Sequence, residues 1–143
     1  MIRCHDGILL LIIKTMKIQI LGSINQDGER VYSIWCKKFL FKWKLFDLVK
    51  LYAGGRISSK PFYYPNPTIA NMAVQICYEN KLLLNNVVIV FNEKSESIQF
   101  IPKSNIDGKK LKNSGFIYNS FQEAYQKELY LKQIWTENLY KVK

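Results

Sequence analysis

The chain is poor in the residues that usually build compact metal and thiol sites. Its 143 residues contain one histidine and three cysteines. An odd, scattered set of cysteines (Cys4, Cys36 and Cys77) with no CxxC spacing does not form a disulfide framework. A zinc site needs about four ligands in close spacing, which His5 beside Cys4 does not supply. The sequence therefore predicts no metal, no cofactor and a reducing, cytoplasmic setting.

Catalytic arrangements are also missing. No glycine-rich phosphate loop of the Walker type is present; Gly54-Gly55 before Arg56 fits an anion cradle or an ordinary flexible turn equally well. Of the eleven acidic residues, Glu123 is expected to cap a helix, and four fall in expected turns: Asp27, Glu93, Glu96 and Asp107. Asp47 is the one acid in a basic and aromatic neighbourhood, and a salt bridge to Lys44 or Lys50 is the plainer explanation. We expect no catalytic residues and a protein that is not an enzyme.

The chain has no apolar run of membrane-spanning length. Its N-terminal run from Ile8 to Ile13 falls far short of the roughly 20 residues that cross a bilayer. The run is also short for a secretory signal, and no small-residue cleavage site follows it. We therefore expect no membrane span. Residues 1–15 are interpreted as a dispensable arm or an extra strand, ahead of a single domain over residues 16–143.

What the sequence does contain is ample material for a folded core. Apolar residues make up 48% and aromatic residues 14% of the chain, more than intrinsically disordered chains carry. Apolar alternation or continuous apolar runs predict four strands. The first two form a hairpin around the turn Asn25-Gln26-Asp27-Gly28, and the last two form another. These strands are 17–21, 31–36, 87–91 and 97–101.

Residues 37–52 carry two competing patterns. Alternation through Phe39, Phe41 and Trp43 favours a third strand ending near Phe46, followed by a loose turn or short helix. The apolar positions from Phe41 to Tyr52 also fit a helical stripe. On a strand, Lys42 and Lys44 share one face while Phe41 and Trp43 share the other. We then expect the aromatic side chains to pack in the core, in preference to forming an exposed stacking platform.

Two helices are indicated by their starts. Asn66-Pro67 combines a capping residue with a first-turn proline, and the helix runs to about Lys81. Ser120 and Glu123 have the spacing of a capping box, and this helix extends to Tyr140. The fold class expected is α+β: an antiparallel sheet of about five strands with two helices packed on one face.

The two helix entries resemble each other. The segment Phe62–Ala70 matches Phe116–Ala124 at an offset of 54 residues, sharing Phe, Tyr, a capping residue and Ala at the same spacing. The match indicates two ββα units over residues 29–82 and 83–140. Coincidence between two helix entries of common chemistry is the competing explanation. Two units are too few for a solenoid, so a fused pseudo-symmetric domain is expected.

The strongest signal is positive charge. Twenty-one Lys plus Arg against eleven Asp plus Glu give a net charge of +10, and lysine outnumbers arginine eighteen to three. A/T-rich coding in a virus, phage or low-GC bacterium explains part of this excess. The basic residues nevertheless cluster in two segments, 37–60 and 103–112. An internal repeat would bring these two segments into one stripe that binds phosphates. The candidate nucleic-acid-binding residues are Lys37, Lys38, Lys42, Lys44, Lys50, Arg56, Lys60, Lys103, Lys109, Lys110 and Lys112.

Two hypotheses follow. The first is a small, basic, phage- or virus-encoded protein that binds nucleic acid without sequence specificity, because few arginines are available for bidentate reading of bases. The alternative is a protein–protein interaction module, either a virion or assembly component or an inhibitor of a host factor, compatible with a homodimer. It rests on interface-type aromatic residues of the last helix, namely Tyr125, Tyr130, Trp135 and Tyr140.

Overall fold

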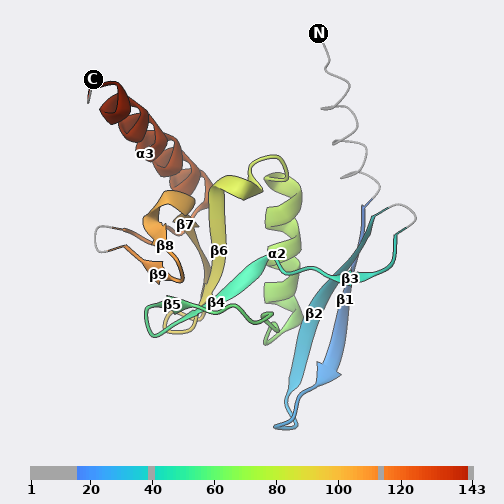
Figure 1. The fold of residues 1–143 in the computed structure, drawn as a ribbon. Coiled ribbons are helices and arrows are strands. Elements are labelled where there is room, and N and C mark those ends of the chain that lie inside the picture. Colours follow the sequence, from blue (N-terminus) through green and yellow to red (C-terminus); the bar gives the residue numbers. More distant parts are fainter. Residues whose placement is uncertain (1–15, 39–40, 113–114, 142–143) are drawn as a thin grey trace. The chain divides into compact units, whose positions relative to one another are not determined.

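The computed structural model describes residues 16–38, 41–112 and 115–141, with side chains up to residue 133 in the last range. Within these residues the chain forms nine strands in two sheets and two long helices (Figure 1). The fold is therefore α+β, as expected. The chain divides into two compact units, Met1–Asp47 with Tyr63–Gln75 and Leu48–Phe62 with Ile76–Lys143.

The first unit contains a three-stranded antiparallel sheet. Strand β1 (Met16–Ile24) pairs along its whole length with β2 (Arg30–Lys38), which also pairs with the short β3 (Lys44–Leu45). The turn between β1 and β2 is closed by Asn25, whose side-chain carbonyl accepts the backbone N–H groups of Asp27 and Glu29 at 3.0 and 2.9 Å. Both strands of this hairpin are confirmed.

A tyrosine that forms an isolated β-bridge, which we call a bridge tyrosine, precedes the first helix. Tyr64 exchanges two backbone hydrogen bonds with Tyr32 of β2, at 2.9 and 2.7 Å. Helix α2 (Pro67–Glu79) begins directly afterwards, and the side chain of Asn66 accepts the N–H of Ile69 at 2.9 Å. Ala70, Ala73 and Cys77 are its buried stripe. The helix start is as expected, and its end lies two residues before Lys81.

Removing this cap should weaken the helix measurably. We expect Asn66→Ala to lower the free energy of unfolding by about 1 kcal/mol, because the N–H of Ile69 loses its acceptor. Urea denaturation followed by circular dichroism measures the change. Thr68→Ala, an exposed substitution two residues on, is the control and should change stability by less than about 0.5 kcal/mol. Equal effects of the two substitutions would contradict a capping role.

The second unit is built on a six-stranded sheet in the order β7-β6-β4-β5-β9-β8. Strand β6 (Val87–Asn92) is central, between β7 (Ser97–Pro102) and β4 (Val49–Ala53), and it runs parallel to β4. Three two-residue strands extend the sheet: β5 (Arg56–Ile57), β8 (Ile106–Asp107) and β9 (Lys110–Leu111). A wholly antiparallel sheet of about five strands was therefore only roughly right.

Both faces of this sheet bury side chains. Ile57, Val90 and Ile101 form one cluster, together with Tyr52, Val88 and other partly buried neighbours. Elsewhere in the unit, Phe62 stacks on Phe91 with ring centroids 5.0 Å apart. Helix α3 (Phe121–Lys141) packs on β7 and β6, and Phe121 meets Phe100 edge to face at 5.9 Å.

The second helix entry repeats the geometry of the first. Tyr118, 54 residues after Tyr64, exchanges two backbone hydrogen bonds with Phe100, both at 2.8 Å. The N–H of Glu123 donates to the Ser120 hydroxyl at 3.1 Å, so Ser120 caps α3 as expected. The resemblance extends to the short hairpins, since β4–β5 and β8–β9 share the same register at this offset.

Residues 37–52 differ from the expectation. Among the described residues that follow β2, only Lys44 and Leu45 pair with it as the strand β3, and Val49–Ala53 form β4 instead of a turn or short helix. The arm predicted over residues 1–15 lies outside the described residues, as do Cys4 and His5. Neither of the described helices is long and apolar enough to cross a membrane.

Candidate nucleic-acid interface

Two short hairpins of the second unit bring together basic residues from both segments. Arg56 on β5 lies directly opposite Lys110 on β9, and the N–H of Ile57 donates to the carbonyl of Lys109 at 2.8 Å. Side chains of paired residues project from the same face of a sheet, and all three basic residues are exposed. We call Arg56, Lys109 and Lys110 the hairpin ridge.

The charge of the hairpin ridge is only partly compensated. Like charges directly opposite each other on a sheet repel. Asp107 lies opposite Lys110 on its other side, which offsets one charge of the row. Within the described part of the chain, no ion pair joins Arg56, Lys109 or Lys110 to a carboxylate. These side chains therefore remain available to an external anion.

The hairpin turns explain the glycines of the first basic segment. Gly54 and Gly55 have φ values of 59° and 76°, which a two-residue turn with positive φ at both central positions requires. The tight turn places Arg56 directly across from Ala53. The glycines thus serve the hairpin, and the structure supplies no separate reason to assign them to an anion cradle.

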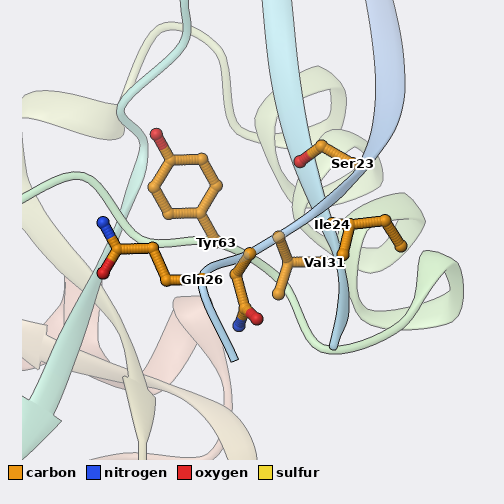
Figure 2. A pocket seen from close by; sticks show the side chains of 6 residues that line it. Ser23, Ile24, Gln26, Val31 and Tyr63 are labelled. Carbon is orange, nitrogen blue, oxygen red and sulfur yellow. The ribbon is translucent and has the colours of Figure 1, made fainter. Parts of the chain in front are cut away.

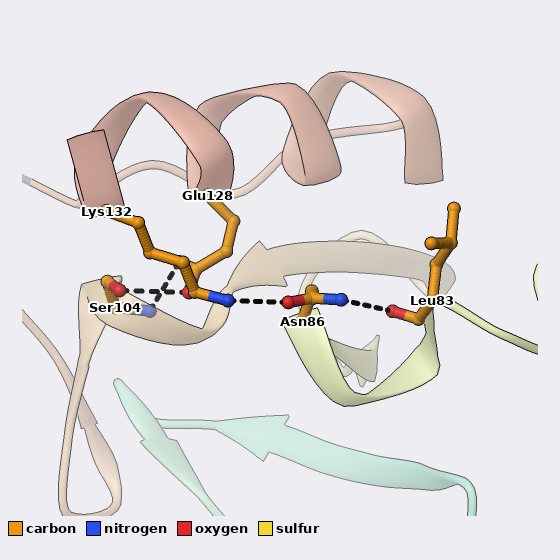
Figure 3. Close-up of polar contacts among 5 residues, drawn as sticks. All are labelled: Leu83, Asn86, Ser104, Glu128 and Lys132. Atoms are coloured by element: carbon orange, nitrogen blue, oxygen red, sulfur yellow. Dashed lines mark hydrogen bonds and ion pairs between the residues drawn. The ribbon is translucent and has the colours of Figure 1, made fainter.

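Two further basic residues of the second unit lie around a hollow of about 460 Å³. Its lining includes Ser104, Lys112 and Lys132. Lys132 donates to the side-chain carbonyl of Asn86 at 2.7 Å, and its ammonium lies 3.8 Å from a carboxylate oxygen of Glu128 (Figure 3). Lys132 is therefore held by the protein, while Lys112 and nearby Lys103 are exposed.

The buried carboxylate of Glu128 explains this arrangement. Glu128 is only 1% exposed. Its two oxygens accept hydrogen bonds from the backbone N–H and the hydroxyl of Ser104, at 2.8 and 3.0 Å (Figure 3). This contact ties α3 to the 3₁₀ turn Lys103–Asn105 that precedes the β8–β9 hairpin. Glu128 therefore stabilises the base of the hairpin ridge. Glu128 was not among the residues predicted from the sequence.

The first unit carries a second group of candidates. Lys38, Lys42 and Lys44 are exposed, whereas Lys37 is half-buried. With Cys36, Phe41 and Leu45, the three exposed lysines line a pocket of about 310 Å³. We call it the lysine–aromatic pocket.

Phe41 and Trp43 do not pack in the core, contrary to the sequence-based expectation, and Phe39 lies outside the described residues. Phe41 is 67% exposed and Trp43 is 41% exposed. Alternation fails here because residues 42 and 43 are not paired in a strand, so no sheet face buries every second side chain.

The remaining candidates, Lys50 and Lys60, lie outside these groups. Lys50 is half-buried and already makes a polar contact. Lys60 is exposed, and its backbone N–H donates to the Ser58 hydroxyl at 3.1 Å. A single stripe across all eleven residues stays a prediction, because the first-unit lysines belong to the other compact unit. The structure brings together Arg56 from the first predicted cluster and Lys109 and Lys110 from the second.

The aromatic residues of α3 divide into three groups. Tyr125 is half-buried and stacks on Phe121 with centroids 6.4 Å apart. Tyr130 is 53% exposed, and the ammonium of Lys127 lies 4.8 Å from its ring centroid. Trp135 and Tyr140 lie on the helix, outside the residues whose side chains are described. The proposed protein interface is thus represented by Tyr130 alone.

Another hollow, of about 440 Å³, lies beside the β1–β2 turn (Figure 2). Figure 2 shows Gln26 and Tyr63 among the side chains around it. None of the residues that line it is charged: they are Ser23, Ile24, Asn25, Gln26, Val31 and Tyr63. It therefore has no group that would neutralise a phosphate.

The one buried tyrosine of the first unit, Tyr64, has a perturbed phenol. Burial, and secondarily the charge of Asp47, raises the pKa of the Tyr64 phenol above its ordinary value of 10.0. Tyr64 is therefore neutral at physiological pH, and its backbone serves the bridge to β2. Among the described residues, no three His, Cys, Asp or Glu side chains gather into a metal-binding group.

Comparison with known proteins adds no further assignment. No family model matches the chain, and no curated protein or solved structure resembles it significantly.

Proposed function

We propose that the protein binds nucleic acid without sequence specificity, through its exposed basic residues. The hairpin ridge carries this proposal. Arg56 and Lys110, more than fifty residues apart in the sequence, are held opposite each other by β5–β9 pairing, and Lys109 directly precedes Lys110. None of the three has a carboxylate partner among the described residues. Such a cluster lowers the energy of a phosphate backbone and releases its counterions.

The excess of lysine over arginine supports binding that does not depend on the base sequence. Lysine presents a compact ammonium that attracts phosphate as a point charge, whereas arginine forms the bidentate contacts that read guanine. Arg56 is the only arginine in the hairpin ridge. We therefore expect contacts to the sugar–phosphate backbone, with affinity that falls steeply as salt rises.

Neutralising the hairpin ridge tests the proposal. We expect the triple substitution Arg56→Gln, Lys109→Gln and Lys110→Gln to weaken binding and to reduce the slope of log affinity against log salt by about 2–3, one unit per lost phosphate contact. Fluorescence anisotropy with a labelled 20-mer duplex and a labelled 20-mer of thymidine, from low to physiological salt, measures both quantities. Thermal melting verifies that the variant is folded.

A matched control separates a specific cluster from overall charge. Lys17, Arg30 and Lys94 are exposed and lie outside the ridge; replacing all three by glutamine removes the same three charges. We expect this control to bind more tightly than the ridge variant. Absence of any complex with wild-type protein at low salt would refute nucleic-acid binding, and equal losses in both variants would refute the assignment to the hairpin ridge.

A second candidate function is a protein-interaction module. It is favoured by Leu129 and Tyr130, neighbours on α3 that are 42% and 53% exposed. A shallow hollow beside Tyr130 is lined also by Tyr118 and Gln126. Sedimentation of a symmetric dimer, lost on replacing Tyr130 by alanine, would favour this function over nucleic-acid binding.

A further inference from the structure

The lysine–aromatic pocket combines the two features that single-stranded nucleic acids require. Lys38, Lys42 and Lys44 supply positive charge, and Phe41 supplies an exposed aromatic face. No carboxylate is among the residues that line the pocket. The arrangement is therefore complementary to a polyanion that carries planar apolar groups.

The exposure of Phe41 has no explanation in the packing of the described residues. Its side chain is 67% exposed, and it makes no contact with another aromatic ring there. Large apolar side chains on a surface are common when scattered singly. Phe41 instead lines a concave pocket among three lysines, with the buried Cys36 and the half-buried Leu45 as its apolar part.

The size of the pocket fits a small planar group. Its volume of about 310 Å³ lies at the lower end of the roughly 300–1,000 Å³ found for small-molecule sites. In a duplex the bases are stacked on one another and their faces are inaccessible. In a single strand the bases are available to stack on aromatic side chains, and stacking tolerates any base sequence.

We propose that the lysine–aromatic pocket binds single-stranded nucleic acid, with one base stacked on Phe41 and the flanking phosphates neutralised by Lys38, Lys42 and Lys44. This inference rests on the proposed function and adds a preference for single strands over duplex. Charge alone attracts both forms, whereas the ring of Phe41 contributes only where a base is unpaired.

Substitutions at Phe41 separate stacking from charge and from apolar area. We expect Phe41→Ala to weaken binding of the labelled thymidine 20-mer at least about fivefold. Its salt slope stays unchanged because no charge is lost, and affinity for the duplex stays unchanged because no base face is available there. Phe41→Leu, which keeps apolar area without an aromatic face, should lose affinity similarly, and Phe41→Tyr should retain it. Fluorescence anisotropy measures all three variants.

Phe116 provides the matched control, because it is 65% exposed and lies outside the pocket. Phe116→Ala should leave both affinities unchanged, and thermal melting should show that Phe41→Ala is as stable as wild type. If wild type binds both nucleic acids but Phe41→Ala or Phe41→Leu behaves like wild type toward the single strand, the stacking site is refuted and the proposed function stands. If wild type binds neither, both are refuted.

Discussion

Glu128→Ala is expected to lower the free energy of unfolding by about 3 kcal/mol. The carboxylate is 1% exposed and accepts two hydrogen bonds from Ser104, one of them from the backbone N–H. Truncation removes both acceptors together and leaves those donors without a partner in a largely buried position. Each unsatisfied buried donor costs about 1–3 kcal/mol.

Urea denaturation of wild type and variant measures this change. Glu128→Gln keeps the side-chain volume and one carbonyl acceptor, so we expect it to be destabilised by less than the alanine variant. Gln122→Ala, on the exposed side of the same helix, is the control for helix truncation and should stay within about 0.5 kcal/mol of wild type. A loss below about 1 kcal/mol for Glu128→Ala would mean that water replaces the carboxylate at Ser104.

Features decided by neighbouring residues could be predicted from the sequence. Asn66 and Ser120 cap their helices as their side chains and spacing indicate. The turn around Gly28, with φ of 80°, and the hairpin of β6 and β7 also follow from local patterns. In each case the decisive hydrogen bonds join residues close in sequence, so local chemistry is sufficient.

Features decided by distant pairing could not be predicted. Strand β4 exists because Val49–Tyr52 bonds in parallel to Ile89–Asn92, about forty residues away. Without that partner, its sequence equally fits a helical stripe. The two-residue strands β5, β8 and β9 are too short to show a period of two, and from the sequence they resemble basic loops.

The predicted internal repeat shows the same division between local and distant features. An offset of 54 residues relates the bridge tyrosines, the helix caps and the short hairpins. The long hairpins do not follow it: Tyr64 pairs with β2, the second strand of its hairpin, and Tyr118 pairs with β7, again the second strand. A uniform offset places β2 on β6 instead. The connections between these elements differ in length, and a linear comparison of sequences does not accommodate that difference.

Predicting the candidate site requires both local sequence patterns and the pairing of distant residues. The basic residues of the hairpin ridge were found by composition, but their juxtaposition depends on the pairing of Arg56 with Lys110. The position of Glu128 in the sequence does indicate burial. It lies at helical spacing from the buried Phe121 and Ala124, and an acid within an apolar stripe indicates a buried polar contact. Its partner Ser104, 24 residues away, could not be found from spacing.

Ile101→Ala is the second large effect that we expect, a loss of about 3–4 kcal/mol in the free energy of unfolding. Ile101 on β7 is 0% exposed and packs with Val90 and Ile57. Removing three carbons there forfeits their transfer free energy and leaves a cavity beside Val90 and Ile57. Ile57 immediately follows Arg56 on β5, so this cluster lies next to the hairpin ridge.

Ile24→Ala makes the same chemical change on a side chain that is 62% exposed, and it should cost less than about 0.5 kcal/mol. Urea denaturation of the two variants gives the difference directly. With the fold retained at low temperature, Ile101→Ala should still bind the duplex and the thymidine 20-mer as wild type does, because the ridge residues themselves are unchanged. A loss of binding in folded Ile101→Ala would instead show that the ridge geometry depends on this packing, and similar stabilities for the two variants would contradict the buried cluster itself.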